Sequence, residues 1–329
     1  MSSNALTVRS YEDVLWQLAE RDDRIVVMTA ENRAAIRGLP NKLGSRFIDV
    51  GICEQTMIGA AAGLALRGRI PVVHALAAFL TMRAFEFIRT DVGIAGLPVK
   101  LVGAVPGLLS EANGPTHQAI EDIALMRGIP GMEIVCPADA TELAELLPEF
   151  LSRPNPGYLR FNSSPTTLRH PDPFAFGKAE RLREGHDVEL MGYGFLVPEL
   201  VAAADILSER GVSTGVLNLR TLAPLDEASV LAAARRAKLL VTVEDHFLHG
   251  GLRTLLAELC LRHCLMPDVL SMGFDAQWFR PALLPQAAER ASLSGARIAE
   301  RVWKFLSGTP VPRDITGRVD LSSNDPREF

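Results

Sequence analysis

Glu54 is the side chain with the clearest opportunity for proton chemistry in this sequence. It follows a short strand pattern at 47–50 and opens a long apolar helix pattern at 54–66. Because open α/β sheets bind ligands beyond the carboxyl ends of their strands, this carboxylate would project into a largely dry crevice. It could exchange protons with a ligand there, or it could only complement the positive end of the helix dipole.

His117 and three apolar residues are further candidates for a site. His117 follows a Gly-Pro-Thr turn, and its imidazole could donate or accept a proton near neutral pH or simply hydrogen-bond within the loop. Phe79, Met82 and Phe85 recur at every third position, which places them on one side of a helix start. Such a side could stack against a flat ring or could be ordinary core.

These candidates must be positioned by strands and helices that alternate along the chain twice. Continuous apolar strands separated by helices predict parallel sheets covered on both faces, and therefore two α/β domains. A Ser-, Thr- and Pro-rich stretch separates them. The predicted division is a first domain at 1–162, a linker at 163–180, a second domain at 181–307 and a polar tail at 308–329. Predicted strands are 25–28, 47–50, 70–74, 99–105, 133–136, 158–161, 188–191, 214–218, 239–243 and 269–272; predicted helices are 11–20, 54–66, 81–94, 120–127, 141–150, 196–210, 226–237 and 252–264.

Composition fits an enzyme and argues against several other classes. The chain has 329 residues, is 48% hydrophobic and carries a formal net charge of -5, which gives no reason to invoke nucleic acid or an acidic membrane surface. No apolar run reaches membrane-spanning length and the start lacks a signal-peptide pattern, so we expect a cytoplasmic location. Cys260 and Cys264 are not accompanied by a second ligand cluster, and we expect no zinc site.

Several blocks of the sequence, taken together, resemble the transketolase-type thiamine diphosphate enzymes. They occur in the family's order and cover nearly the whole chain. The resemblance implies that the first domain is the pyrimidine-binding domain and the second is the family's C-terminal domain. The blocks are 46–65, 79–89, 113–118, 136–139, 192–194, 243–246 and 250–252.

The resemblance also implies roles for the candidate residues. Glu54 would hydrogen-bond N1′ of the aminopyrimidine and promote the tautomer that deprotonates the cofactor, whose thiazolium carbon does the chemistry. Phe79, Met82 and Phe85 would surround the aminopyrimidine, although Met82 stands where the family usually has an aromatic residue. His117 would face the substrate and assist proton transfer at its hydroxyls or carbonyl.

Substrate contacts are implied for a second group of residues. Arg9 and Arg160 resemble arginines that clamp a sugar phosphate, which suits the guanidinium fork. Thr29 lies near a family serine that helps bind the phosphate, and Glu31 lies near a family aspartate on the thiazolium side. An anionic substrate end, whether phosphate, sulfonate or carboxylate, is therefore expected.

Two positions depart from an ordinary transketolase. Asn113 stands where an aspartate normally contacts a donor hydroxyl, and Val105 stands where the family has a substrate-facing histidine. These changes make the donor pocket less polar and do not favour the standard pentulose phosphate donor. The run Glu244-Asp245-His246 is interpreted as structural, capping the helix that starts after Gly250-Gly251.

The sequence contains no Gly-Asp-Gly motif, with which the family's N-terminal domain holds the diphosphate through Mg²⁺. We therefore expect half of an enzyme, inactive alone, whose partner is a separate diphosphate-binding subunit in a two-plus-two heterotetramer. The expected cofactors are thiamine diphosphate and Mg²⁺, the latter held mainly by the partner. Open alternatives are a 1-deoxyxylulose-phosphate-synthase-like enzyme, a 2-oxo acid dehydrogenase β subunit, and a non-catalytic stabilising subunit.

Overall fold

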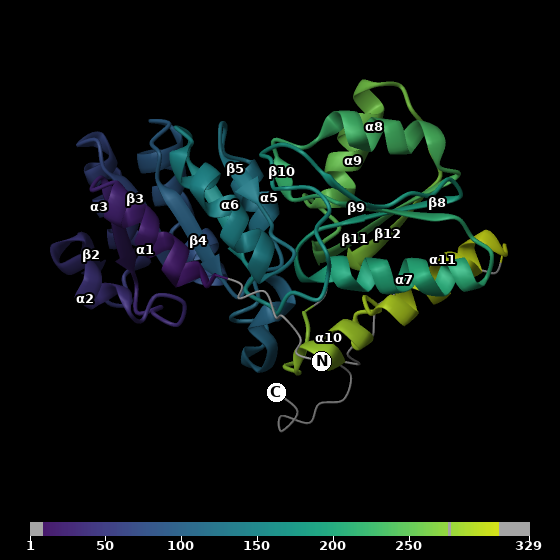
Figure 1. Ribbon diagram of the computed structural model, residues 1–329, viewed down its shortest axis with the longest axis horizontal. Helices are drawn as coiled ribbons and strands as arrows, with labels where there is room; N and C mark the ends of the chain where they lie inside the picture. The colour runs from purple at the N-terminus through teal and green to yellow at the C-terminus, as the bar shows by residue number, and fades with distance from the viewer. Residues whose placement is uncertain (1–8, 276–277, 309–329) are drawn as a thin grey trace, which may run out of the picture.

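The computed structural model describes residues 9–275 and 278–308, and the strands of these residues form one sheet of seven strands and one of five (Figure 1). The first sheet contains β1 (Ile25–Thr29), β2 (Phe47–Asp49), β3 (Ile70–Leu76), β4 (Lys100–Ala104), β5 (Glu133–Val135), β6 (Gly157–Phe161) and β10 (Thr221–Ala223), in the order β10-β5-β6-β4-β3-β1-β2. The second contains β7 (Glu180–Arg183), β8 (Val188–Gly192), β9 (Thr214–Asn218), β11 (Leu239–Phe247) and β12 (Val269–Phe274), in the order β12-β11-β8-β9-β7.

Parallel pairing brings the carboxyl ends of several strands to one edge of the first sheet. Thr29 at the end of β1 pairs with Asp49 of β2 and His74 of β3, and Ala104 at the end of β4 pairs with Leu76 of β3. The loops that follow these strands therefore leave the sheet side by side. This is the edge at which the sequence places Glu54, Phe79 and Val105.

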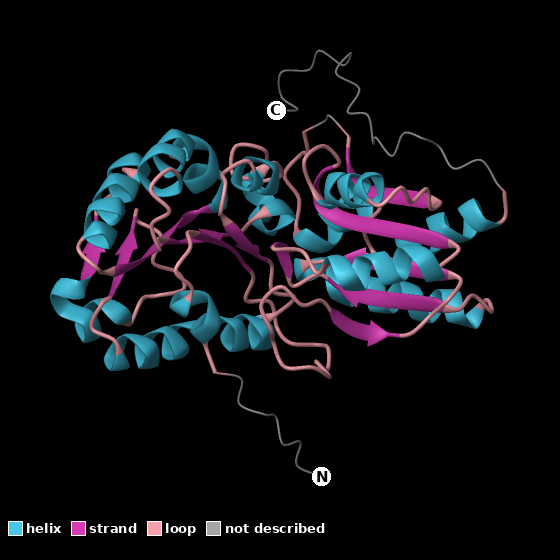
Figure 2. Ribbon diagram, turned by 90° about the horizontal axis from the view of Figure 1, so that it is seen from above, coloured by secondary structure: helices cyan, strands magenta, loops and turns pink. Residues whose placement is uncertain are grey.

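Helices cover both faces of the first sheet (Figure 2). Alternate residues of β1 enter different cores: Val27 packs with α1 and α6, whereas Val26 and Met28 pack with α3 and the segments that follow β3. The helical segments of this part are α1 (Tyr11–Arg21), α2 (Leu39–Leu43), η1 (Gly44–Arg46), α3 (Glu54–Leu66), η2 (Phe79–Arg83), α4 (Phe85–Phe87), η3 (Ile88–Gly93), η4 (Gly107–Asn113), α5 (Asp122–Arg127) and α6 (Ala140–Ser152).

The second sheet is covered in the same way. α7 and α11 pack together on one face, and α8 and α9 lie in the core that continues into the first domain. No helix among the described residues is long and apolar enough to cross a membrane. The helical segments are η5 (Gly194–Leu196), α7 (Val197–Glu209), α8 (Glu227–Arg236), α9 (Leu252–Arg262), α10 (Leu284–Arg290) and α11 (Gly295–Leu306).

The predicted fold class, two α/β domains with parallel sheets, is confirmed with one refinement. Each sheet is parallel except for one antiparallel edge strand, β10 in the first and β7 in the second. Both are short, and β10 follows β9 in the chain yet pairs with β5, so alternation could not predict it. The predicted tail lies outside the described residues apart from Gly308.

The predicted helix at 81–94 is the clearest local error. The chain there forms two π-helical stretches, η2 and η3, around the short helix α4. π-helical turns are rare and occur often at functional sites. Because they change the number of residues per turn, the three-residue spacing of Phe79, Met82 and Phe85 does not describe one side of a regular α-helix.

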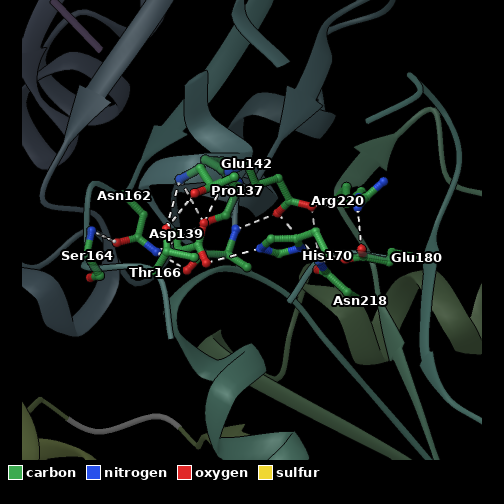
Figure 3. Close-up of polar contacts among 12 residues, drawn as sticks. Pro137, Asp139, Glu142, Asn162, Ser164, Thr166, His170, Glu180, Asn218 and Arg220 are labelled. Atoms are coloured by element: carbon green, nitrogen blue, oxygen red, sulfur yellow. Dashed lines mark hydrogen bonds and ion pairs between the residues drawn. The ribbon is translucent and has the colours of Figure 1, made fainter. Parts of the chain in front are cut away.

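The linker is fixed to both domains through His170 (Figure 3). Its Nε2 lies 3.1 Å from Oδ2 of Asp139, which caps α6, and its Nδ1 lies 2.9 Å from Oε2 of Glu180, where β7 begins. These two hydrogen bonds, opposed by burial, raise the pKa of His170 to about 10. Arg220 pairs with Glu142 of α6 and with Glu180. The linker is therefore part of a continuous network of charges between the domains.

Candidate active site

Asp49 at the end of β2 shapes the turn that leads to Glu54. Its Oδ1 accepts from the backbone N–H of Gly51 at 2.9 Å and of Glu31 at 3.3 Å, and its Oδ2 accepts from Arg33 Nε at 2.6 Å. Burial opposes the charge of Asp49, but these hydrogen bonds outweigh it and lower the pKa of the carboxyl. Gly51 has a φ of 71°, which favours glycine at this turn. The loops after β1 and β2 are thereby joined beside the start of α3.

Glu54 is the first residue of α3 and is only 1% exposed. Its Oε2 accepts from Nη1 of Arg83 at 2.9 Å. Among the described residues no group donates to its other oxygen, Oε1. The neighbouring positions Met57 and Ile58 are fully buried and apolar. Among the residues described, the site thus holds a buried carboxyl group with one cationic partner and a second oxygen that accepts no hydrogen bond.

Arg83 connects Glu54 to two other predicted residues. Its Cζ lies 4.3 Å from the centroid of the Phe79 ring, and that ring meets the His117 imidazole edge to face, with centroids 5.1 Å apart. His117 is half-buried, and its Nδ1 lies 2.8 Å from Oγ1 of Thr116. We call Glu54, Phe79, Arg83 and His117 the Glu54 cluster. Glu54, Phe79 and His117 were predicted from the sequence, whereas Arg83, which connects Glu54 to Phe79, was missed. The available signal was an arginine beside aromatic residues inside the motif at 79–89.

Met82 and Phe85 lie in the same segment as Phe79. Met82 is 37% exposed, and Phe85 is half-buried against the core that contains α3. Their predicted contacts with an aminopyrimidine are not tested by this arrangement and stay a prediction.

The end of β1 and the loops after β1 and β4 carry further predicted pocket residues. Thr29 is buried, and its Oγ1 both donates to the backbone oxygen of Asn32 and accepts from its N–H, at 3.0 Å each. Glu31 is exposed with a φ of 62°, next to Asp49. Asn113 is exposed at the end of η4. Val105, with a φ of 46°, holds a strained conformation for a β-branched residue, of the kind that clusters at functional sites.

Arg9 and Arg160 lie in different surroundings. Arg9 is exposed before α1 and reaches Gln17 at 3.4 Å. Arg160 is 3% exposed, with Nε 2.8 Å from Oδ2 of Asp122 and Nη1 2.7 Å from Oδ1 of Asp245 in the second domain. Burial opposes its charge, but the two carboxylates raise the pKa of Arg160 well above its usual value. These contacts favour a role for Arg160 in linking the two domains over a role in binding substrate. A substrate phosphate could reach the guanidinium only after the ion pairs with Asp122 and Asp245 had broken.

The predicted capping role of Glu244 is confirmed. Its Oε2 accepts from the N–H of Leu252 at 2.6 Å and its Oε1 from that of Arg253 at 3.0 Å, at the start of α9. His246, the third residue of this acidic-histidine run, lies with Nε2 3.3 Å from the backbone nitrogen of Ala124 in α5. The run therefore joins the second domain to the first.

One group of described residues has the donor atoms for a metal ion. Ligand atoms of Glu142, His170 and Glu180 lie within 4.8 Å of one another. Arg220 already pairs with both carboxylates, and it supplies the positive charge that a metal ion would bring. We therefore assign this group to the interdomain network rather than to a metal centre.

Comparison with known proteins identifies both halves of the chain. The family described as the transketolase pyrimidine-binding domain matches residues 4–167, and the family described as the transketolase C-terminal domain matches residues 177–298. The 6-deoxy-6-sulfo-D-fructose transketolase subunit SqwH of Clostridium sp. (strain MSTE9) is 39% identical over 262 residues, which cover 78% of this chain and 81% of the relative.

Two further matches extend this likeness. The 1-deoxy-D-xylulose-5-phosphate synthase of Synechococcus sp. (strain JA-2-3B'a(2-13)) is 36% identical over 317 residues, which cover 90% of this chain and 47% of the synthase. The chain thus spans about half the length of that relative. A solved structure titled as a split gene transketolase, inactive beta4 tetramer, is similar with a TM-score of 0.82 and 30% identity, covering 91% of this chain and 98% of that one.

Proposed function

We propose that this chain, which belongs to the transketolase family, is a subunit of a split, thiamine diphosphate-dependent transketolase. The family membership expected from the sequence is confirmed by the two family matches and the 39% identical relative. In this proposal the enzyme transfers a two-carbon ketol unit, or a related acyl unit, between carbonyl substrates. The observation that carries the proposal is Glu54, a buried carboxylate at the carboxyl edge of the sheet, to whose Oε1 no residue of 9–275 or 278–308 donates a hydrogen bond.

The Glu54 cluster fits the aminopyrimidine of the cofactor. Glu54 Oε1 can accept a hydrogen bond from a protonated ring nitrogen, and a hydrogen bond to a charged group contributes about 1.5–3 kcal/mol. The Phe79 ring, the partly exposed Met82 side chain and the half-buried Phe85 ring can pack against a flat heterocycle. When bound, thiamine diphosphate would supply the nucleophilic carbon and the electron sink.

His117 is assigned to the substrate side of the site. Its imidazole contacts the Phe79 ring, and it can hold or release a proton at a substrate hydroxyl or carbonyl. Asn113 would hydrogen-bond the donor without charge, and Glu31 would lie on the thiazolium side. Thr29 would act through the turn that it holds, and Arg9 remains the candidate contact for an anionic substrate end.

The site requires a partner that holds the diphosphate. We assign this role to a separate subunit that binds Mg²⁺, in a cytoplasmic two-plus-two heterotetramer. Two of the similar proteins are named as a transketolase subunit and as a split gene transketolase, and this supports the assignment. Ile52, Met82 and Phe87 are exposed apolar residues in the segments that carry Glu54 and Arg83, and they offer the partner an apolar contact.

A synthase-like reaction is the second candidate. It is favoured by the 36% identity to a 1-deoxy-D-xylulose-5-phosphate synthase over 317 residues. That enzyme class differs in its donor, so pyruvate as donor separates the two reactions. A third alternative, a non-catalytic stabilising subunit, would bind the partner subunit without any turnover of donor.

The test combines the chain with its separately purified partner, thiamine diphosphate and Mg²⁺. Donor consumption is followed for ketose phosphates, 6-deoxy-6-sulfo-D-fructose and pyruvate. We expect turnover that needs both subunits and is abolished by Glu54→Gln, while the exposed control Glu209→Gln keeps wild-type activity. Equal turnover by Glu54→Gln would refute the role of Glu54, and a complex that binds cofactor but consumes no donor would refute the proposed reaction.

A further inference from the structure

Arg83 bridges the two residues to which the proposed function gives the aminopyrimidine contacts. Its Nη1 donates to Glu54 Oε2 at 2.9 Å, and its guanidinium carbon lies 4.3 Å from the Phe79 ring centroid. The Arg83 side chain is 40% exposed, whereas that of Glu54 is 2% exposed. The Arg83 side chain therefore joins a solvent-accessible position to the buried carboxylate.

The positive charge of Arg83 compensates the negative charge of the buried Glu54 carboxylate. A buried carboxylate without a cation is strongly unfavourable, and Arg83 forms the ion pair that compensates it among the described residues. The planar guanidinium also restricts the orientation of the carboxylate, and its contact with Phe79 restricts the guanidinium in turn. A lysine could supply the charge but not this planar geometry.

We infer that Arg83 is a positioning residue for the reaction: it holds Glu54 through Oε2 and thereby keeps Oε1 available for the aminopyrimidine nitrogen. The inference rests on the proposed function, since it deepens the role given there to Glu54. Arg83 acts through the carboxylate and does not touch the reacting atoms. Two consequences follow, one for cofactor binding and one for the stability of the free subunit.

Cofactor binding is measured by isothermal titration calorimetry of thiamine diphosphate into the assembled complex, alongside steady-state kinetics. Arg83→Gln should weaken cofactor binding and lower kcat by about tenfold to a hundredfold, by analogy with the loss of a side chain that orients a metal ligand. The KM of the donor should change little. Arg83→Lys should recover part of the loss through its charge. The matched control is Arg89→Gln, an exposed arginine of η3 without a side-chain partner among the described residues, and it should bind cofactor like the wild type.

Stability of the free subunit supplies a readout that needs no cofactor. Arg83→Gln should lower the urea midpoint because Glu54 loses its cation, and adding Glu54→Gln should restore most of the midpoint, since the two effects are coupled. If the subunit with Arg83→Gln does not fold, Arg83→Lys decides by the same measurements.

The outcomes separate this inference from the proposed function. Cofactor binding by Arg83→Gln equal to that of Arg89→Gln would overturn the positioning role. Tighter binding would also overturn it, because the guanidinium would then compete with the aminopyrimidine for the site. If the wild-type complex binds cofactor but turns over no donor, the proposed reaction is refuted, while the comparison of cofactor binding still decides the role of Arg83. If the wild-type complex binds no cofactor, both the proposed function and the role of Arg83 are refuted.

Discussion

Replacing Arg160 by methionine is the sharpest test of how the two domains are held together. In the structure its guanidinium lies between Asp122 of the first domain and Asp245 of the second, and all three side chains are at most 3% exposed. Methionine fills a similar volume but removes the charge. Asp122 keeps the hydrogen bond from Tyr158 Oη at 2.6 Å, whereas Asp245 loses both guanidinium donors.

The expected magnitude follows from this burial. Removing one member of a buried ion pair costs about 3–5 kcal/mol, because the remaining charge stays desolvated and uncompensated. That is a large share of the roughly 5–15 kcal/mol by which native proteins are stable. The cost should fall on the contact between domains, so the unfolding transition should separate into two steps as well as move to lower urea. Adding Asp245→Asn to the variant should recover part of the loss.

Urea unfolding of the free subunit, followed by circular dichroism, measures both effects. The control is Arg262→Met. Arg262 and its partner Glu227 are both well exposed, so removing this ion pair should leave the unfolding transition nearly unchanged. A cost for Arg160→Met below about 1 kcal/mol with one unaltered transition would contradict the reasoning, given the magnitude expected for a buried pair. If instead the variant is stable and only the KM of a phosphorylated substrate rises, the phosphate-clamp role predicted from the sequence gains support.

Two further predictions concern the linker and the cap of α9. The pKa of His170 is raised from 6.5 to about 10 in the folded chain, so the stability that His170 contributes is complete below about pH 6.5 and is lost as the pH rises through 10. Urea midpoints should therefore drop more over this pH range for the wild type than for His170→Gln. Parallel plots of urea midpoint against pH for the two proteins would refute this linkage. Gly251→Ala should destabilise the chain by about 0.5–2 kcal/mol, the range for losing a helix cap, because a Cβ there would collide with the Glu244 carboxylate. Gly63→Ala in α3, where a Cβ meets nothing within 4 Å, should be neutral or stabilising, and equal losses for both variants would argue against the cap.

Much of the fold could be predicted because apolar periodicity records how each segment is buried. The helix pattern at 54–66 and the strand pattern at 214–218 match α3 and β9 residue for residue. The position of Glu54 at a strand-to-helix junction was equally readable, since parallel sheets gather such junctions at one edge. The π-helical winding at 79–93 was not readable, because an apolar run does not reveal how many residues form each turn.

The sequence by itself determined the two α/β domains, the family and the location of Glu54, because these depend on local pattern and on motifs. The tertiary structure alone decided the partners of the charged side chains. Arg83 contacts Glu54 from 29 positions away, and Arg160 contacts Asp245 from 85 positions away. A charged residue shows the same letter whether it faces solvent, a substrate or a buried carboxylate, so only the folded packing decides which of these it meets.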